Sequence, residues 1–330
     1  MCTRIVYHGL QQQVLTARSM DWKTDLHTNL WVLPRGGVRD GNCGAHSAAW
    51  PVRYGSVIAT GYDICSTDGV NEVGLVANLL WLAESEYPQT RSAKAKLTIA
   101  AWAQYVLDQF ATVAQVVEAL AQEPFDLLTS HVPKESRLAT LHLSLSDPTG
   151  DSAVIEYIAG KQVIHHDRAF QVMTNSPTFE EQLALNKYWA SIGGTVMLPG
   201  TNRAADRFAR ASFYINAIEK PDDPDMAVAS VLSVIRNVSV PLGLSTPNEP
   251  NISSTRWRSV VDHACLHYYF ESTTTPNVFW VDLKKLDFSA QAGVRRLALG
   301  PNQRNIFHGE VHARFVEAPM FEFLGVHAQG

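Results

Sequence analysis

The order of strand-like and helix-like segments is the feature that most constrains the fold of this chain. Segments with the β-strand pattern and segments with helical periodicity follow each other in blocks: strands, two helices, strands, two helices, strands. A doubly wound parallel sheet requires alternation of single strands and helices, so this order argues against it. We predict an α+β fold in which two mainly antiparallel sheets stack between outer helix layers, formed as a single domain by residues 1–330.

The predicted strands are rich in β-branched and aromatic residues and are separated by turn signals such as Asp147-Pro148-Thr149-Gly150 and Thr67-Asp68-Gly69. They cover Thr3–His8, Val14–Ala17, Leu30–Leu33, Ser56–Ile64, Gly74–Leu82, Leu138–Ser146, Ala153–Ile158, Gln162–His165, Gln171–Thr174, Ala264–Ser272, Asn277–Leu283 and Val311–Val316. Helical periodicity predicts helices over Lys94–Phe110, Thr112–Gln122, Arg203–Ile218 and Pro224–Val238. The segment Gly243–Ser254, rich in Pro, Asn and Ser, is predicted as a long loop.

The composition narrows the classes of partner that this chain can have. Hydrophobic residues make up 46% of the chain and charged residues 18%, and the formal net charge is only -5, with no run of Lys or Arg. These values are typical of a globular protein and argue against nucleic acid or an anionic membrane as the main partner. No stretch approaches the ~18 consecutive apolar residues of a membrane span.

The cysteines and histidines do not form a metal or disulfide pattern. The four cysteines lie far apart, and His263 and His267 lack the carboxylate partner of a metal-binding motif. We therefore expect no metal and no cofactor. Because no basic segment with an apolar run precedes Cys2, we expect a cytoplasmic protein from the sequence as given, and a periplasmic one if a leader has been removed.

A cysteine directly after the initiator methionine is the first feature with a catalytic implication. The small side chain of Cys2 should allow an aminopeptidase to remove Met1, which would leave a free α-amine on the residue that carries the thiol. An α-amine has a pKa of about 7.7–8.0 and is partly neutral near neutral pH. It can therefore serve as the base that activates the sulfur. The alternative is a cysteine at this position without a catalytic role.

Charged residues that could support such a nucleophile follow the second predicted strand. Alternation would place Arg18 and Asp21 near one end of the sheet. An arginine beside Cys2 would stabilise a thiolate, and a carboxylate could fix the position of the amine. The alternative is a solvated Arg–Asp pair in a turn.

Several motifs together resemble the choloylglycine hydrolase family, which includes bile salt hydrolases and penicillin V acylases. They occur in the order found in that family and extend from Cys2 to about Trp280. The motifs are Met1-Cys2-Thr3-Arg4, Arg18-Ser19-Met20-Asp21, Asp68-Gly69-Val70-Asn71-Glu72-Val73-Gly74-Leu75, Met173-Thr174-Asn175-Ser176-Pro177-Thr178-Phe179, and Leu198-Pro199-Gly200 through Arg207-Phe208-Ala209-Arg210.

The resemblance implies the four-layer αββα fold of N-terminal-nucleophile (Ntn) hydrolases. It implies that Cys2 is the nucleophile and, through its α-amine, the base, with Arg18 and Asp21 beside it. Asn175 matches the asparagine whose side-chain amide faces the oxyanion, although an asparagine before Ser176-Pro177 is also a common turn residue. Arg210 matches the active-site arginine of the family, with Arg207 as the alternative alignment.

The resemblance also implies substrate-binding positions at Met20, Trp22 and Trp81, and two of them indicate a branch of the family. Trp81 stands where bile salt hydrolases carry an asparagine, and Asn78, three residues earlier, does not replace it. The backbone NH of Trp81 can still supply the second oxyanion donor. Together, Trp22 and Trp81 resemble the Gram-negative penicillin V acylase branch, whose members also accept N-acyl homoserine lactones. The alternative is that both indoles are core residues.

The segment between Asn175 and Arg210 is shorter than in bile salt hydrolases, where it includes a hairpin that helps to hold tetramers together. We expect a homo-oligomer, either a tetramer or a dimer. Its substrate would be a small N-acyl amide. The expected activity is that of a cysteine Ntn amidase of the penicillin V acylase type, with N-acyl homoserine lactone acylase activity as an extension. The alternatives are a conjugated bile salt hydrolase and an inactive Ntn-fold binding protein.

Overall fold

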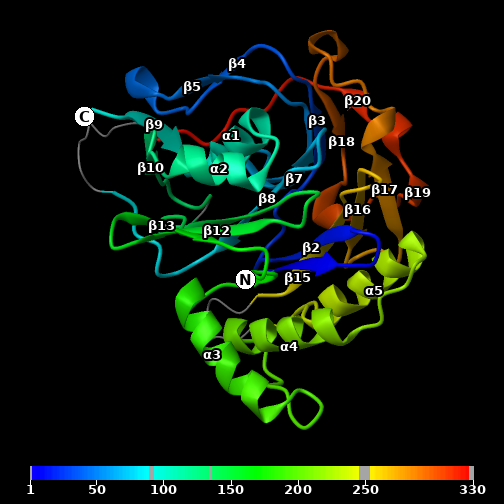
Figure 1. The fold of residues 1–330 in the computed structure, drawn as a ribbon. Helices are drawn as coiled ribbons and strands as arrows, with labels where there is room; N and C mark the ends of the chain where they lie inside the picture. Colours follow the sequence, from blue (N-terminus) through cyan, green and yellow to red (C-terminus); the bar gives the residue numbers. More distant parts are fainter. Residues whose placement is uncertain (1, 89–92, 134, 245–252, 327–330) are drawn as a thin grey trace.

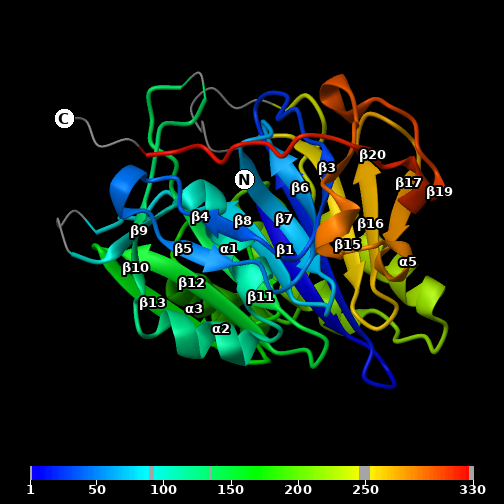
Figure 2. The same ribbon diagram turned by 90° about the horizontal axis from the view of Figure 1, so that it is seen from above.

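The computed structural model describes residues 2–88, 93–133, 135–244 and 253–326. Two large sheets stack face to face, and helices cover the outer face of each (Figure 1). Helices α4 and α5 contact one sheet through β1 and β2, whereas α1 and α2 contact the other through β7, β8 and β12. In the view from above, β1 of one sheet and β7 of the other overlap near the centre of the molecule (Figure 2). The predicted four-layer αββα architecture is confirmed.

The first sheet has seven strands in the order β14-β1-β2-β15-β16-β17-β19. Neighbouring strands are antiparallel, apart from β17 and β19, which are parallel. The strands are β1 (Cys2–His8), β2 (Val14–Asp21), β14 (Val172–Met173), β15 (Thr255–Asp262), β16 (His267–Ser272), β17 (Val278–Asp282) and β19 (Gly309–Glu310). Strand β1, which starts at Cys2, lies inside this sheet, between β14 and β2.

The second sheet has nine strands in the order β13-β12-β11-β8-β7-β6-β3-β18-β20, and its neighbours pair antiparallel. Its strands are β3 (Leu30–Leu33), β6 (Ser56–Gly61), β7 (Cys65–Asn71), β8 (Val76–Trp81), β11 (Leu141–Ser146), β12 (Ser152–Ile158), β13 (Lys161–His166), β18 (Arg295–Leu297) and β20 (Val316–Glu317). Two small ribbons flank it, formed by β4 (Val38–Asp40) with β5 (Ala49–Pro51) and by β9 (Ala95–Thr98) with β10 (Phe125–Leu128).

The helices are α1 (Trp102–Gln109), α2 (Val113–Leu120), α3 (Phe179–Ile192), α4 (Ala204–Ala217) and α5 (Pro224–Asn237). Their starts have physical causes in the sequence. Helix α3 begins with a capping box in which Thr178 and Glu181 satisfy each other's backbone NH groups, and at α5 the Asp223 carboxylate accepts from two NH groups of the first turn. Within the described ranges, no helix is both long and apolar enough to cross a bilayer.

Some sequence predictions were wrong in detail. The turn predicted at Asp68-Gly69 lies inside β7, because the chain reverses earlier, at Tyr62 and Asp63, which both adopt positive φ. The first part of the helix predicted over 94–110 is strand β9, which pairs with β10. The strand predicted over 311–316 is mainly a short 3-10 turn.

Two major elements were not predicted. Helix α3 buries only Phe179 and Gln182 fully, so its sequence lacks a broad apolar stripe that would have indicated a helix. Strand β15 lies in the middle of its sheet but carries Arg256 and Arg258, which obscured its strand character. The loop predicted over 243–254 lies mainly outside the described residues.

The glycine at position 69 shows how closely α1 packs on the second sheet. A Cβ atom built on Gly69 would lie 2.8 Å from the Val57 carbonyl oxygen, 2.7 Å from Ile58 Cγ2 and 3.0 Å from Leu107 Cδ1. Leu107 belongs to α1 and both other contacts come from β6. The sheet and the helix therefore meet at a point where a side chain has no room.

We predict that Gly69→Ala lowers the free energy of unfolding by about 1–3 kcal/mol, because the added methyl group must displace backbone atoms. Gly200→Ala is the matched control, since a Cβ there meets no atom of the described chain within 4 Å. It should change stability by less than about 0.5 kcal/mol. Chemical denaturation of both variants measures the difference, and equal stability of the two would show that the contact between β7 and α1 is looser than described.

Candidate active site

The register of β1 and β2 brings the predicted nucleophile and its neighbours together. Cys2 lies opposite Met20 and Arg4 opposite Arg18, so strand alternation points the side chains of Cys2, Met20 and Arg18 to the same face of the sheet. This is the face that meets the second sheet, because Arg18 donates to the carbonyl oxygens of Leu79 in β8 and Thr67 in β7. Cys2 is only 3% exposed.

The guanidinium of Arg18 contacts the sulfur of Cys2 directly. Arg18 Nη2 lies 3.2 Å from Cys2 Sγ and 3.1 Å from the Leu79 oxygen, and Nη1 lies 2.6 Å from the Thr67 oxygen. The two carbonyl groups fix the guanidinium in place. A cation at this distance stabilises negative charge on the sulfur. Met20 Sδ lies 3.8 Å from Cys2 Sγ and packs against the same sulfur.

The side chain of Asn175 binds the backbone nitrogen of Cys2. Its Oδ1 accepts from Cys2 N at 2.6 Å and from Arg207 Nη2 at 2.8 Å, while its Nδ2 donates to the Trp81 carbonyl oxygen at 2.6 Å. Two donors on one side and one acceptor on the other fix the orientation of the amide. One hydrogen of Nδ2 is used by Trp81, which leaves the second for a further acceptor. If Met1 is removed, Cys2 N becomes the α-amine.

The backbone NH of Trp81 lies on the same side of strand β8 as the Trp81 carbonyl group that binds Asn175. Leu82 N donates to the Thr140 oxygen at 3.0 Å, and Leu141 N donates to the hydroxyl of Tyr87 at 2.8 Å, so Trp81 and Leu141 form a pair without mutual hydrogen bonds. The NH and carbonyl groups of Trp81 therefore both point away from β11. That is the side on which Asn175 binds the carbonyl.

Of the two arginines of the α4 motif, Arg207 contacts Cys2 and Arg210 does not. Arg207 is fully buried, and its Nη1 donates to the Cys2 carbonyl oxygen at 2.7 Å and to the hydroxyl of Thr3. Burial lowers the pKa of Arg207, and the charges of Asp21 and Cys2 oppose that shift. Asp21 Oδ2 lies 3.8 Å from Arg207 Nη1, and Asp21 Oδ1 accepts from Thr255 Oγ1 at 2.6 Å.

The structure does not bring Arg210 to the nucleophile. Its Nη1 donates to the carbonyl oxygens of Pro199 and Thr201, at 2.7 and 2.8 Å, and so holds the segment that precedes α4. Arg207 and Arg210 are three residues apart on α4 and both lie in the matching motif, so spacing alone could not separate them. In contrast, the structure brings Arg207 together with the other predicted catalytic residues, Cys2, Arg18, Asp21 and Asn175.

A buried carboxylate–histidine network behind Asn175 escaped the sequence interpretation. Glu156 Oε1 lies 3.1 Å from His142 Nδ1, and His142 Nε2 lies 3.0 Å from the carbonyl oxygen of Thr174, the residue before Asn175. Burial alone would raise the pKa of Glu156, but hydrogen bonds from His142 and His165 outweigh it and lower the pKa to about 2. The network fixes the backbone that carries Asn175. These residues belong to separate strands, so no local motif signals their contact.

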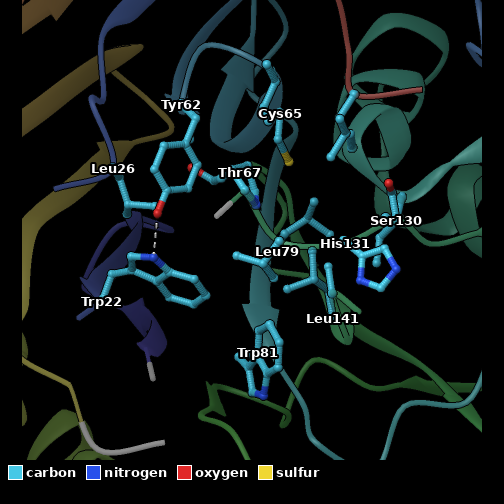
Figure 3. A pocket seen from close by; sticks show the side chains of 18 of the residues that line it. Trp22, Leu26, Tyr62, Cys65, Thr67, Leu79, Trp81, Ser130, His131 and Leu141 are labelled. Atoms are coloured by element: carbon cyan, nitrogen blue, oxygen red, sulfur yellow. Dashed lines mark hydrogen bonds between the residues drawn. The ribbon is translucent and has the colours of Figure 1, made fainter. Parts of the chain in front are cut away.

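An apolar pocket leads to Cys2 and contains the predicted substrate positions (Figure 3). Trp22 and Trp81 line it with ring centroids 5.8 Å apart at 53°, and Trp22 Nε1 donates to the hydroxyl of Tyr62 at 2.9 Å. Leu79 of β8 and Leu141 of β11, both in the second sheet, line the same pocket near Trp81 (Figure 3). The pocket combines flat aromatic surfaces with aliphatic ones and therefore suits an apolar acyl group. Met20 lines it as well.

Two penicillin V acylases are similar to this chain over nearly its whole length. A 55% identical relative, covering 98% of this chain and 92% of its own length, is the penicillin V acylase of Pectobacterium atrosepticum. The solved structure of penicillin V acylase from Agrobacterium tumefaciens is 61% identical and superposes with a TM-score of 0.93, covering 98% of this chain and all of that one.

A more distant solved structure has the same fold. The conjugated bile acid hydrolase of Clostridium perfringens, in a mutant form, is 20% identical and superposes with a TM-score of 0.78 over 94% of this chain and 98% of that one. The family model for linear amide C–N hydrolases matches residues 2–295. This chain belongs to the choloylglycine hydrolase family of linear amide C–N hydrolases.

Proposed function

We propose that this enzyme is an acylase of the penicillin V type that also cleaves N-acyl homoserine lactones. The observation that carries the proposal is the apolar pocket, walled by two indoles, that Cys2 also lines, with Arg18 and Asn175 in contact with that residue. The names of the relatives from Pectobacterium atrosepticum and Agrobacterium tumefaciens support penicillin V as a substrate.

In the proposed mechanism, Cys2 acts as nucleophile and base after removal of Met1. The α-amine takes the thiol proton, and Arg18, 3.2 Å from Sγ, stabilises the thiolate. The sulfur attacks the amide carbon while the acyl group occupies the apolar pocket. The α-ammonium then protonates the leaving amine, and the bond between carbonyl carbon and nitrogen breaks. Water attacks the thioester in the second half, with the same α-amine as base.

The remaining polar groups would stabilise and orient these steps. The second hydrogen of Asn175 Nδ2 and the NH of Trp81 are the proposed donors to the oxyanion of both tetrahedral intermediates. Asn175 Oδ1 holds the nitrogen of Cys2 at 2.6 Å, which orients the base toward the sulfur. We assign the role of the active-site arginine to Arg207 in place of Arg210, because Arg207 binds both Cys2 and Asn175. Asp21 would balance its charge.

Two further properties are part of the proposal. A single domain over residues 1–330 is supported by the shared core, in which Ile5 and Leu15 of one sheet cluster with Val57 of the other. A homo-oligomer, a dimer or a tetramer, is supported by large apolar side chains exposed on and after α3, such as Tyr188 at 62% and Val196 at 80%.

We predict that Asn175→Ala lowers kcat by roughly 10²–10³ with little change in KM, because an oxyanion donor acts mainly in the transition state. Asn216→Ala, which removes an exposed asparagine side chain on α4, is the control and should leave both constants unchanged. Steady-state kinetics with penicillin V measures the effect. A normal kcat in Asn175→Ala would contradict the oxyanion assignment.

We predict that the wild-type enzyme cleaves penicillin V and long-chain N-acyl homoserine lactones faster than glycocholate. Trp81 places a large flat ring beside the reacting centre, which disfavours a bulky steroid by a modest factor. Trp81→Asn should lower kcat/KM for penicillin V and leave that for glycocholate unchanged or improved. A panel of the three substrates on one enzyme preparation tests this.

Other outcomes of the panel support the alternatives. If the wild type cleaves glycocholate faster than both other substrates, the bile salt hydrolase alternative replaces the proposal. If it cleaves none of them, an inactive Ntn-fold binding protein replaces it.

A further inference from the structure

Arg137 lies against both tryptophans of the pocket. Its Cζ is 4.2 Å from the centroid of the Trp81 ring and 5.5 Å from that of Trp22. A guanidinium over an indole face is held by the electrostatic attraction between the cation and the π system. The contact therefore fixes a positive charge at the two rings that wall the acyl pocket.

Arg137 belongs to a short antiparallel ladder between residues 130–132 and residues 137–139. His131 and Leu138 form a β-bridge, Val132 N donates to the Arg137 oxygen at 3.0 Å, and Ala139 N donates to the Ser130 oxygen at 2.9 Å. Residues from both sides of this ladder line the apolar pocket, whereas Arg137 does not. Arg137 is thus attached to the pocket wall but lies outside the apolar space.

The terminal nitrogens of Arg137 have unused hydrogen-bonding capacity. Its Nε donates to Glu135 Oε2 at 2.5 Å, and Nη1 and Nη2 make no hydrogen bond to the part of the chain that the structure describes. Lys23 Nζ lies 3.6 Å from the same Glu135 oxygen. Two cations share one carboxylate, so this group keeps one excess positive charge. The Arg137 side chain is 30% exposed, which leaves it open to a ligand.

The position of Arg137 relative to Cys2 indicates which part of a substrate would reach the charge of Arg137. Trp81, under Arg137, is also the residue whose carbonyl binds Asn175, and Asn175 binds the nitrogen of Cys2. With the acyl group in the apolar pocket and the amide carbon at Cys2 Sγ, the amine half must extend out of that pocket. Arg137 lies outside it, against the same two rings.

We propose that Arg137 binds an anionic group on the amine half of the substrate and so makes the enzyme prefer amides of amino acids over neutral amides. A carboxylate is the group that a guanidinium with two free terminal nitrogens recognises. This inference rests on the proposed function and deepens it. The amine half of penicillin V carries a carboxylate, whereas a homoserine lactone is neutral, so Arg137 would favour penicillin V over an N-acyl homoserine lactone.

The test compares two probes that differ only in charge: N-phenoxyacetylglycine and N-phenoxyacetylglycinamide. We expect Arg137→Gln to lower kcat/KM for the charged probe, N-phenoxyacetylglycine, about tenfold, and to change kcat/KM for the neutral probe, N-phenoxyacetylglycinamide, by less than about threefold. Arg137→Lys should keep part of the preference, because it keeps the charge but not the planar guanidinium. Arg236→Gln is the matched control. Arg236, on helix α5, is also an exposed arginine that pairs with a glutamate, Glu271, and it does not line the apolar pocket.

A measurement without substitution covers the case in which the Arg137 variants do not fold. Added salt should lower the wild-type ratio of kcat/KM between the charged and the neutral probe, because it screens an exposed charge pair. A ratio that does not respond to salt, or equal losses on both probes in Arg137→Gln, would show that Arg137 only braces the tryptophans. A wild-type enzyme that cleaves penicillin V but neither probe would overturn this assignment alone, whereas one that cleaves neither penicillin V nor the probes would overturn the proposed function as well.

Discussion

The buried guanidinium of Arg18 is the interaction on which the site depends. It is a fully buried cation between the two sheets, and its terminal nitrogens bind the oxygens of Thr67 and Leu79 and the sulfur of Cys2. A buried charge is costly unless hydrogen bonds and an opposite charge compensate it. The carbonyl groups of Thr67 and Leu79 supply the hydrogen bonds, and a thiolate at Cys2 would supply the opposite charge. The packing of the two sheets and the reactivity of the sulfur are thereby coupled.

Cys2 itself joins two layers of the molecule. Its sulfur points between the sheets, whereas its backbone carbonyl binds Arg207 of helix α4 and its nitrogen binds Asn175. Asn175 in turn reaches the Trp81 carbonyl in β8, and the buried pair of His142 and Glu156 holds the backbone just before it. Every atom of Cys2 that the mechanism uses is therefore fixed by a different element. This fits a nucleophile whose base lies on the same residue, since small shifts would separate nitrogen from sulfur.

Sequence reasoning reached the fold class and the family because these depend on long patterns. Block order predicted the two sheets, and motifs around Cys2, Arg18 and Asn175 were dense enough to indicate the family. It could not choose between Arg207 and Arg210. The two residues lie three positions apart on α4, and the sequence does not show which of them reaches Cys2. It also missed α3, whose sequence has no broad apolar stripe facing the core, and it missed Arg137, whose position is defined by contacts with two tryptophan rings distant in sequence. What it missed depends on tertiary contacts, which leave no local periodicity.

The central claim is that the nitrogen of Cys2 must be a free amine. The most direct measurement produces the enzyme with a protease-removable extension before Cys2 and follows penicillin V hydrolysis together with intact mass. The account predicts no turnover while Cys2 N is part of a peptide bond, and full activity once the mass shows that the chain begins at Cys2. Full activity from a chain that still carries a residue before Cys2 would contradict it.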